Sequence, residues 1–271
     1  TPDSLQAFES DGFEVGTNSG INGNTFNFVS WNWKANGAGS ANTAGSINST
    51  VSANTTSGFS VVSYTGTGAN ATVGHGLGVA PKMILIKNTI DAVAWEVGHD
   101  AIGWTKKLRL NATDAEAVDS GAFNNTAPTS SVFSLGTNNT SNDSGDSMIA
   151  YCFAEKQGYS KFGSYTGNGN ADGTFVYTGF KPAFVMIKNT SATGVWRMWD
   201  NKRDVDNPNT ANFQANASNA EYNDPAVAID FLSNGFKPRS TDSSYNGSGS
   251  NYIYMAFAEA PLVGDNPTTA R

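Results

Sequence analysis

The stretch Ser63-Tyr64-Thr65-Gly66-Thr67-Gly68 returns 101 residues later as Ser164-Tyr165-Thr166-Gly167-Asn168-Gly169. The same offset holds without a gap for more than thirty residues and pairs Pro81 with Pro182. Inside this window, the segment Lys82–Lys87 is apolar on both alternating faces, which is typical of a central strand buried on both sides. A segment that recurs at a fixed spacing predicts a structural unit that the chain uses more than once.

A second motif closes each unit. The segment Ser147–Glu155 is matched by Asn251–Glu259, and a weaker copy lies near the N-terminus at Asn27–Lys34. In the first copy, apolar residues alternate with Ser30 and Asn32, as expected of a half-buried strand, and the other two copies carry apolar residues at the same positions. The side chains expected to face the core are Val29, Trp31 and Trp33 in the first copy, Ile149, Tyr151 and Phe153 in the second, and Ile253, Met255 and Phe257 in the third.

The two motifs divide the chain into five predicted segments. The N-terminal segment has the closing motif without an opening half, so we expect the chain to begin inside a repeat. The next segment consists mainly of Gly, Ala, Asn, Ser and Thr and is expected to be a linker, with at most one edge strand at Ser46–Ser52. The predicted segments are residues 1–35, the C-terminal half of an incomplete first repeat; 36–57, the linker; 58–157, the second repeat; 158–260, the third repeat; and 261–271, a C-terminal tail.

The composition is typical of an all-β chain. Gly, Asn, Ser and Thr are abundant, and these residues favour turns and polar strand faces over helix interiors. Aromatic residues make up 11% of the chain, which is enough to fill real cores. The sequence therefore predicts tandem antiparallel β-sandwich-like repeats, with helical turns only at Asn111–Val118 and Asn216–Tyr222. A β-solenoid is the alternative, although its coils would need a much shorter repeat.

Charge and cysteine content exclude several classes of partner and framework. The net charge of −7 argues against a nucleic-acid partner, because phosphate contacts need clustered Lys and Arg. No apolar run approaches the roughly 18 residues of a membrane span, so membrane insertion is not expected. The single cysteine, Cys152, excludes an internal disulfide framework, and we expect it to be a small buried side chain rather than a nucleophile.

Residues suited to catalysis are scarce. The chain has two histidines, and His75 lies in a glycine-rich turn that does not need a histidine in the other repeat. The repeated acids Glu155 and Glu259 each end a strand in separate units, whereas glycoside cleavage needs two carboxyl groups in one cleft. No Ser/His/Asp triad is predicted either. We therefore expect a protein that is not an enzyme, and an extracellular glycan hydrolase is the weakest functional class.

Two oxygen-rich loops are the candidates for binding a hard cation such as Ca²⁺, and no other cofactor is expected. They are Asn142–Asp146 and Asp204–Asn207, and neither fits the twelve-residue loop of a helix–loop–helix calcium site. Solvated turns are the plainer interpretation of both. The candidate ligands are Asp143, Asp146, Asp204 and Asp206.

Aromatic side chains are the usual contacts for sugars, which stack on rings through their apolar faces. Trp95 and Trp196 recur at the repeat offset, so we expect them in the two cores. Trp104, Trp199 and Tyr245 have no partner at that offset. These three are the predicted surface candidates for binding a carbohydrate, such as a glycan of a host surface.

The quoted motifs carry a resemblance to a known family. The segment Ser63–Met83 resembles the opening of a repeat domain of unknown function that is found in predicted virion and tail proteins of marine bacteriophages. Ala150–Glu155, Gly158–Gly167 and Met255–Glu259 are similar to later motifs of that domain. The resemblance spans nearly the whole chain and implies a structural or tail-associated role in a virion, without catalytic residues to carry over.

The leading hypothesis is therefore a structural component of a bacteriophage particle, such as a tail fibre, an appendage or a surface decoration protein. The expected partners are copies of the same chain or other virion proteins, and the expected location is the virion or the extracellular space. An extracellular carbohydrate-binding adhesin or filament subunit is the alternative. Val29, Trp31 and Trp33 are the candidate assembly interface, because an incomplete repeat would expose their apolar stripe and an unpaired strand edge.

Overall fold

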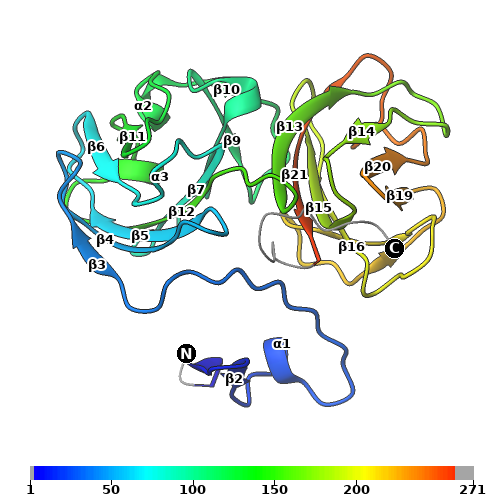
Figure 1. Cartoon of the computed structure of the whole chain (residues 1–271), viewed down its shortest axis with the longest axis horizontal. Coiled ribbons are helices and arrows are strands. Elements are labelled where there is room, and N and C mark those ends of the chain that lie inside the picture. The colour runs from blue at the N-terminus through cyan, green and yellow to red at the C-terminus, as the bar shows by residue number, and fades with distance from the viewer. Residues whose placement is uncertain (1–2, 260–271) are drawn as a thin grey trace. The chain divides into compact units, whose positions relative to one another are not determined.

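The computed structural model describes residues 3–259 of the chain, so the predicted tail at 261–271 lies outside the described residues. The protein is all-β and its strand pairs are antiparallel, as expected from the composition. The chain divides into two compact units, one that ends at Trp33 and a larger one that begins at Lys34. The larger unit contains two β-sandwiches that follow one another in sequence (Figure 1).

The N-terminal unit is a small hairpin followed by one helical turn. Its elements are β1 (Leu5–Phe8), β2 (Phe13–Val15) and α1 (Ser19–Asn22). The predicted strand at Asn27–Lys34 is not formed: this segment has no regular structure, and Val29, Trp31 and Trp33 are half-buried. The alternating pattern alone was insufficient, because a strand needs a neighbour for its backbone groups, and β1 and β2 pair with each other.

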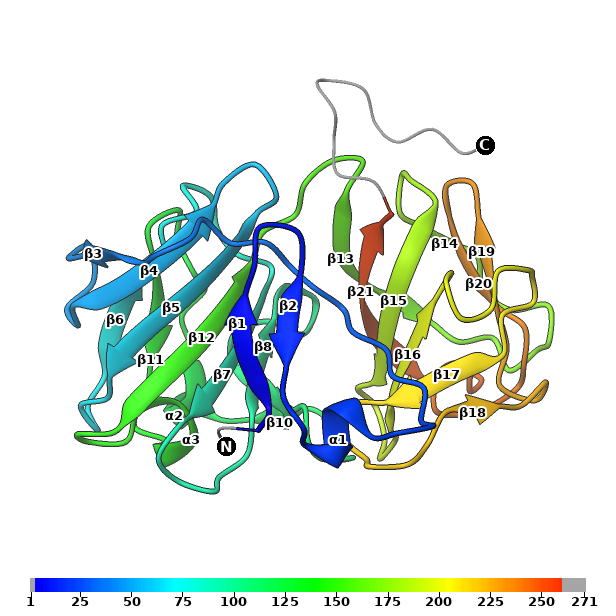
Figure 2. The same ribbon diagram turned by 90° about the horizontal axis from the view of Figure 1, so that it is seen from below.

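The first sandwich is built on an eight-stranded antiparallel sheet. Figure 2 shows its central strands β5, β12 and β7 side by side. Across the sheet the strands are β10 (Ala117–Val118), β9 (Lys106–Arg109), β8 (Glu96–His99), β7 (Met83–Asn88), β12 (Ser147–Phe153), β5 (Phe59–Thr65), β4 (Ser49–Asn54) and β3 (Ser40–Asn42). The second layer comprises β6 (Ala71–Gly74) paired with β11 (Val132–Leu135) and the short helices α2 (Ser120–Phe123) and α3 (Asn139–Asn142). A 3₁₀ turn, η1 (Asp100–Ile102), follows β8.

The second sandwich repeats this arrangement. Its six-stranded sheet has the order β13 (Ser160–Thr166), β21 (Asn251–Ala258), β15 (Pro182–Asn189), β16 (Trp196–Asp200), β17 (Ala211–Gln214) and β18 (Tyr222–Asn223). Its second layer is β14 (Val176–Tyr177), β20 (Gly235–Pro238) and β19 (Ile229–Leu232). The order β5–β12–β7–β8–β9–β10 in the first sheet corresponds strand by strand to β13–β21–β15–β16–β17–β18 in the second. This is the order that two copies of one unit would have.

Each sandwich has its own buried core between its layers. The predicted central strand is confirmed, because Ile84 and Ile86 on β7 are fully buried, and so are Val185 and Ile187 on β15. The predicted face of the closing strand is wrong: Met148, Ala150 and Cys152 face the first core, while Ile149 and Tyr151 on the other face of β12 are half-buried. Both faces of the closing strand are apolar, so alternation could not identify the inner one.

Two further expectations differ from the structure. The predicted linker contains two strands, β3 and β4, which extend the first sheet beyond β5, and it buries Ile47 and Val51 in the core. Of the two strands, β4 overlaps the one strand that was expected at Ser46–Ser52. An edge strand of mostly small polar residues needs few apolar positions, so its composition resembled that of a linker. The predicted helical turns at Asn111–Val118 and Asn216–Tyr222 are also absent, and each segment ends instead in a short edge strand.

Aromatic rings and hydrogen bonds join the two sandwiches. The rings of Phe153 and Phe257 lie 6.0 Å apart between centroids. Trp196 Nε1 donates to the carbonyl oxygen of Arg109 at 2.9 Å, and the buried Lys188 Nζ donates to that of Thr113 at 3.0 Å. The two sandwiches therefore pack directly against each other within the larger unit.

Candidate functional site

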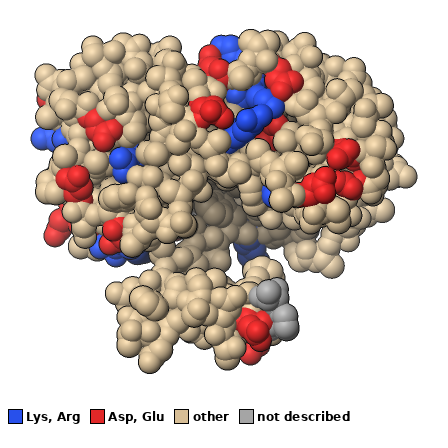
Figure 3. All heavy atoms as spheres, turned by 180° about the vertical axis from the view of Figure 1, so that it is seen from behind, with Lys and Arg blue, Asp and Glu red and all other residues tan. Residues whose placement is uncertain are grey.

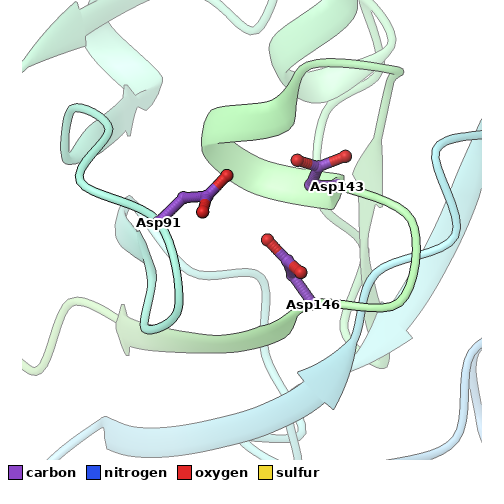
Figure 4. A group of neighbouring side chains, drawn as sticks. All are labelled: Asp91, Asp143 and Asp146. Carbon is purple, nitrogen blue, oxygen red and sulfur yellow. The ribbon is translucent and has the colours of Figure 1, made fainter.

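Three carboxylates converge at one end of the first sandwich (Figure 4). Asp91 lies in the loop after β7, and Asp143 and Asp146 lie between α3 and β12. Their nearest carboxylate oxygens are all within 4.8 Å of one another. Lys87 Nζ donates to the carbonyl oxygen of Asp91 at 2.9 Å and supplies one positive charge beside the group. Three carboxylates and one ammonium leave a net negative site near the surface.

The fold holds these loops together through one buried side chain, Asn88. Its Nδ2 donates to Asp146 Oδ2 at 2.8 Å, and its Oδ1 accepts from the backbone N–H groups of Ile90 and Asp91, both at 2.9 Å. The end of β7 and the start of β12 are neighbours because the strands are antiparallel, with Asn88 opposite Met148. Asp91 was not predicted, because it lies about fifty residues from the Asp143–Asp146 loop and only strand pairing brings it there.

In the second sandwich, Asn189 makes the same backbone hydrogen bonds as Asn88, but the carboxylates are missing. Asn189 Oδ1 accepts from the backbone N–H groups of Ser191 and Ala192 at 2.9 and 3.0 Å. The 101-residue offset places Ala192 at the position of Asp91, and matching backbone hydrogen bonds from Gly66 and Gly167 place Ser250 at that of Asp146. The second sandwich therefore forms these loops without an acidic residue at the positions of Asp91 and Asp146, so the fold does not require either carboxylate.

Oxygen ligands at this spacing are suited to a hard cation, and the calcium hypothesis for Asp143 and Asp146 stays a prediction, with Asp91 as a third ligand. Asp204 is different, because its Oδ2 accepts from the backbone N–H of Thr210 at 2.8 Å and closes its own loop. Asp206 is exposed. Within residues 3–259, neither Asp204 nor Asp206 belongs to a group of three side chains that could ligate a metal.

Calcium is expected to raise the thermal unfolding midpoint of the full chain, because a ligand that binds only the folded state stabilises it by about 2.7 kcal/mol at one hundred times its Kd. Asp91→Ala, which copies the second sandwich, should abolish most of the rise. Asp206→Ala is the matched control and should keep it. Scanning calorimetry with and without chelator tests this, and an equal rise in both variants would rule out the aspartate group as the binding site.

The aromatic residues predicted to bind carbohydrate are in the cores. Trp104, Trp199 and Tyr245 have 6%, 0% and 0% of their surface exposed, so the prediction of surface positions is wrong. Gly98 on β8 makes room for the buried ring of Trp104, because a Cβ at position 98 would lie 2.4 Å from that ring. Trp199 and Tyr245 pack against each other with ring centroids 5.1 Å apart. They lack partners at the repeat offset because the two cores are filled differently.

The cysteine, histidine and glutamate side chains considered above for catalysis are buried, hydrogen-bonded or ion-paired within the fold. Burial raises the pKa of the Cys152 thiol to about 12, and Cys152 is fully buried, as expected for a small core side chain. His75 is also buried: its Nδ1 accepts from the backbone N–H of Leu77 at 3.2 Å, which fits the predicted turn. Glu155 pairs with Lys161 at 2.7 Å, and Glu259 pairs with Lys202.

Charged residues make up 14% of the chain. Figure 3 shows one face, on which acidic and basic side chains are few and lie among each other. A cleft of about 360 Å³ lies between the sandwiches, and its lining includes Lys106, Glu116, Ser164, Thr166 and Asn251. Among residues 3–259, no helix is long and apolar enough to cross a membrane.

The fold and these sites define an all-β protein with two antiparallel sandwiches of equivalent strand order, an acidic surface loop group and buried aromatic cores. The chain belongs to the family described as a domain of unknown function (DUF7483), whose model matches residues 1–261. No curated protein matches the chain. No solved structure matches it either.

Proposed function

We propose that this protein is a structural component of a bacteriophage particle, either in a tail fibre or appendage or as a surface decoration, and that it assembles through its N-terminal unit. The sequence resemblance to virion and tail proteins supports a role in a bacteriophage particle. The all-β fold supports a stiff extracellular body. The partners are copies of the same chain or other virion proteins. The observation that carries the assembly role is the exposure of aromatic side chains before residue 34.

All four phenylalanines of the N-terminal unit are exposed, and three of them have more than half of their surface open to solvent. Phe8, Phe26 and Phe28 have 81%, 70% and 51% of their surface exposed. Apolar side chains gathered on so small a unit mark an association surface. The unit's sheet is a single two-stranded hairpin, which is marginally stable by itself in water. A partner that covers these rings would stabilise the hairpin while it forms the contact.

Backbone edges offer a second route of association for the same unit. Both β1 and β2 are edge strands, since each pairs with the other. Another chain can add a strand to such an edge, with main-chain hydrogen bonds for affinity and side-chain pockets for register. The aromatic side chains Phe8 on β1 and Phe13 on β2 would then select the partner.

The test is the combined variant Phe8→Ser, Phe26→Ser and Phe28→Ser. The wild-type chain is expected to form oligomers in sedimentation velocity, and the variant should be a folded monomer with an unchanged circular dichroism spectrum. The control replaces three exposed apolar residues of the larger unit, Val118, Tyr177 and Val205, with Ser and should still assemble. Trp31 and Trp33 are less suitable targets, because they are half-buried and their loss would also disturb packing.

The alternative function is an extracellular carbohydrate-binding adhesin or filament subunit. The three aromatic residues that were expected to contact sugars in such a protein are buried in the cores. This alternative keeps the cleft between the sandwiches, whose hydroxyl and amide groups on Ser164, Thr166 and Asn251 match the hydrogen bonding of sugars. Assembly by the triple variant equal to that of the wild type would contradict the proposed role of the N-terminal unit. Tight glycan binding by that variant would favour the adhesin.

We also propose that the protein is not an enzyme, in the sense that it turns over no substrate. This proposal is supported by the structural contacts of His75, Cys152, Glu155 and Glu259.

A further inference from the structure

A second group of charged side chains is buried in the first sandwich. Glu96 on β8 and Lys107 on the neighbouring β9 have side chains that are 0% and 8% exposed. Asp119 follows β10, which pairs with β9. Lys107 Nζ lies 2.7 Å from Asp119 Oδ2 and 3.3 Å from Glu96 Oε2. One amine is thus held between two carboxyl groups, of which that of Glu96 is fully buried and that of Asp119 lies on a side chain that is 29% exposed.

The carboxyl group of Asp119 is fixed by further donors. Its Oδ1 accepts from the backbone N–H of Gly121 at 2.8 Å, and its Oδ2 accepts from Asn138 Nδ2 at 3.0 Å. Gly121 permits this approach, because a Cβ at that position would lie 2.1 Å from Asn138 Oδ1. Donors aimed at both oxygens stabilise negative charge that develops on them when a nucleophile attacks the carboxyl carbon.

Glu96 has a feature that its pairing with Lys107 does not explain. Its Oε2 accepts from Thr140 and Lys107, whereas its Oε1 is buried and has no hydrogen-bond partner. A buried oxygen without a partner is costly and needs an explanation. Burial raises the pKa of Glu96 above its ordinary value, and the hydrogen bond from Thr140 and the charge of Lys107 only partly offset this effect. A carboxyl group that holds a proton here can pass it to a neighbour.

The second sandwich shows that the fold does not require this group. Strand register places Arg197 at the position of Glu96 and Asn212 at that of Lys107, and Arg197 Nη1 donates to Asn212 Oδ1 at 2.8 Å. A guanidinium stays protonated and an amide is a poor nucleophile, so the equivalent site has no reactive amine. The combination of amine, aspartate and glutamate is therefore a property of the first sandwich.

We infer that Lys107 and Asp119 join in an intramolecular amide bond, with Glu96 as the residue that transfers the proton. The two side chains are in contact, and the reaction between them needs no cofactor. The chain has a single cysteine, so an internal disulfide cannot supply a covalent cross-link. The bond ties β9 to the segment after β10, so it locks the short strands at this edge of the first sheet. It adds a covalent element to the protein and is independent of the assembly role.

The step balances without an oxidant or a co-reactant. In the ion pair, hydrogen bonds from Lys107 and Asn138 outweigh the effect of burial and hold the pKa of Asp119 below its ordinary value. Transfer of one proton from Lys107 Nζ to Asp119 Oδ2, across their hydrogen bond, gives a neutral amine and a carboxylic acid. The nitrogen lone pair then attacks Asp119 Cγ and forms the C–N bond. Glu96 carries a proton from that nitrogen to Oδ2, the Cγ–Oδ2 bond breaks, and water leaves.

Intact mass measurement of the purified full chain tests the inference. We expect a mass lower than that of the sequence by one water molecule. A tryptic digest should contain residues 107–109 linked to residues 110–156, because the amide blocks cleavage after Lys107, trypsin cleaves after Arg109, and no Lys or Arg lies between Arg109 and Lys156. Lys107→Arg and Glu96→Gln should each restore the full mass, the first by removing the nucleophile and the second by removing the proton carrier.

Lys106→Arg is the matched control. Lys106 lies next to Lys107 on β9 and pairs with Glu116, and this variant should still lose one water. Far-ultraviolet circular dichroism of each variant distinguishes a missing bond from a failure to fold. A folded wild-type chain with the full sequence mass would overturn the inference. A water loss that maps elsewhere, for example to a succinimide at an Asp-Gly sequence, would overturn it as well.

Discussion

Replacing Phe257 with Ala is expected to destabilise the larger unit by about 3–5 kcal/mol, the range for removing a buried Phe. Phe257 is 5% exposed and lies at the centre of the aromatic contact between the sandwiches. Its ring centroid is 5.7 Å from that of Tyr159, 5.8 Å from Phe162, 6.0 Å from Phe153 and 6.4 Å from Phe184. The cavity left by Ala would remove packing inside the second sandwich and across the contact at once. Urea unfolding measures the change.

A double-mutant cycle separates these two contributions. If the contact between Phe257 and Phe153 couples the sandwiches, the combined loss for Phe153→Ala and Phe257→Ala should differ from the sum of the single losses by at least about 0.5 kcal/mol. Val205→Ala is the control and should change stability by less than about 0.5 kcal/mol, since Val205 is 75% exposed. A loss below about 1 kcal/mol for Phe257→Ala would contradict the role assigned to this ring.

The repeated motifs carried enough information to predict the central strands and the all-β class. The segment containing Ile84 and Ile86 is apolar on both faces, and only a strand covered on both sides needs that pattern. The closing strand was harder to orient for the same reason. On β21, Tyr252, Tyr254 and Ala256 face the core, while Phe257 on the other face is buried against the first sandwich. Alternation identifies an inner face only where the outer face is polar.

The candidate sites could be predicted only in part, because they depend on contacts between distant segments. Asp143 and Asp146 lie in one loop and were recognised, whereas Asp91 joins them through the pairing of β7 with β12. Trp104 was misplaced for a similar reason. Its burial depends on Gly98 on a neighbouring segment, and a comparison of repeats cannot show that one core uses a ring where the other does not.

Acid is expected to weaken the contact between the sandwiches through His99. This side chain is fully buried, with Nε2 at 3.3 Å from the carbonyl oxygen of Tyr254 and Nδ1 accepting from the backbone N–H of Ala101 at 3.1 Å. Both contacts are satisfied by a neutral ring that carries its hydrogen on Nε2. Burial lowers the pKa of His99 to about 4; the Tyr254 carbonyl and Asp100 oppose the shift, and Lys82 adds to it. Protonation of Nδ1 would break the bond to Ala101.

The direction of the pH effect follows from the two pKa values. The ordinary pKa of 6.5 applies to the unfolded chain, so between pH 6.5 and pH 4 the unfolded state binds more protons than the folded state. Stability therefore falls as the pH falls through this window, by about 2–3 kcal/mol at pH 4.5. His99→Asn should flatten this dependence, because its side-chain oxygen can accept from the same N–H without titrating. His75→Asn is the comparison variant and should retain most of the dependence. Urea unfolding at pH 7 and pH 4.5 provides the measurement, and equal slopes for the wild type and His99→Asn would show that another group is responsible.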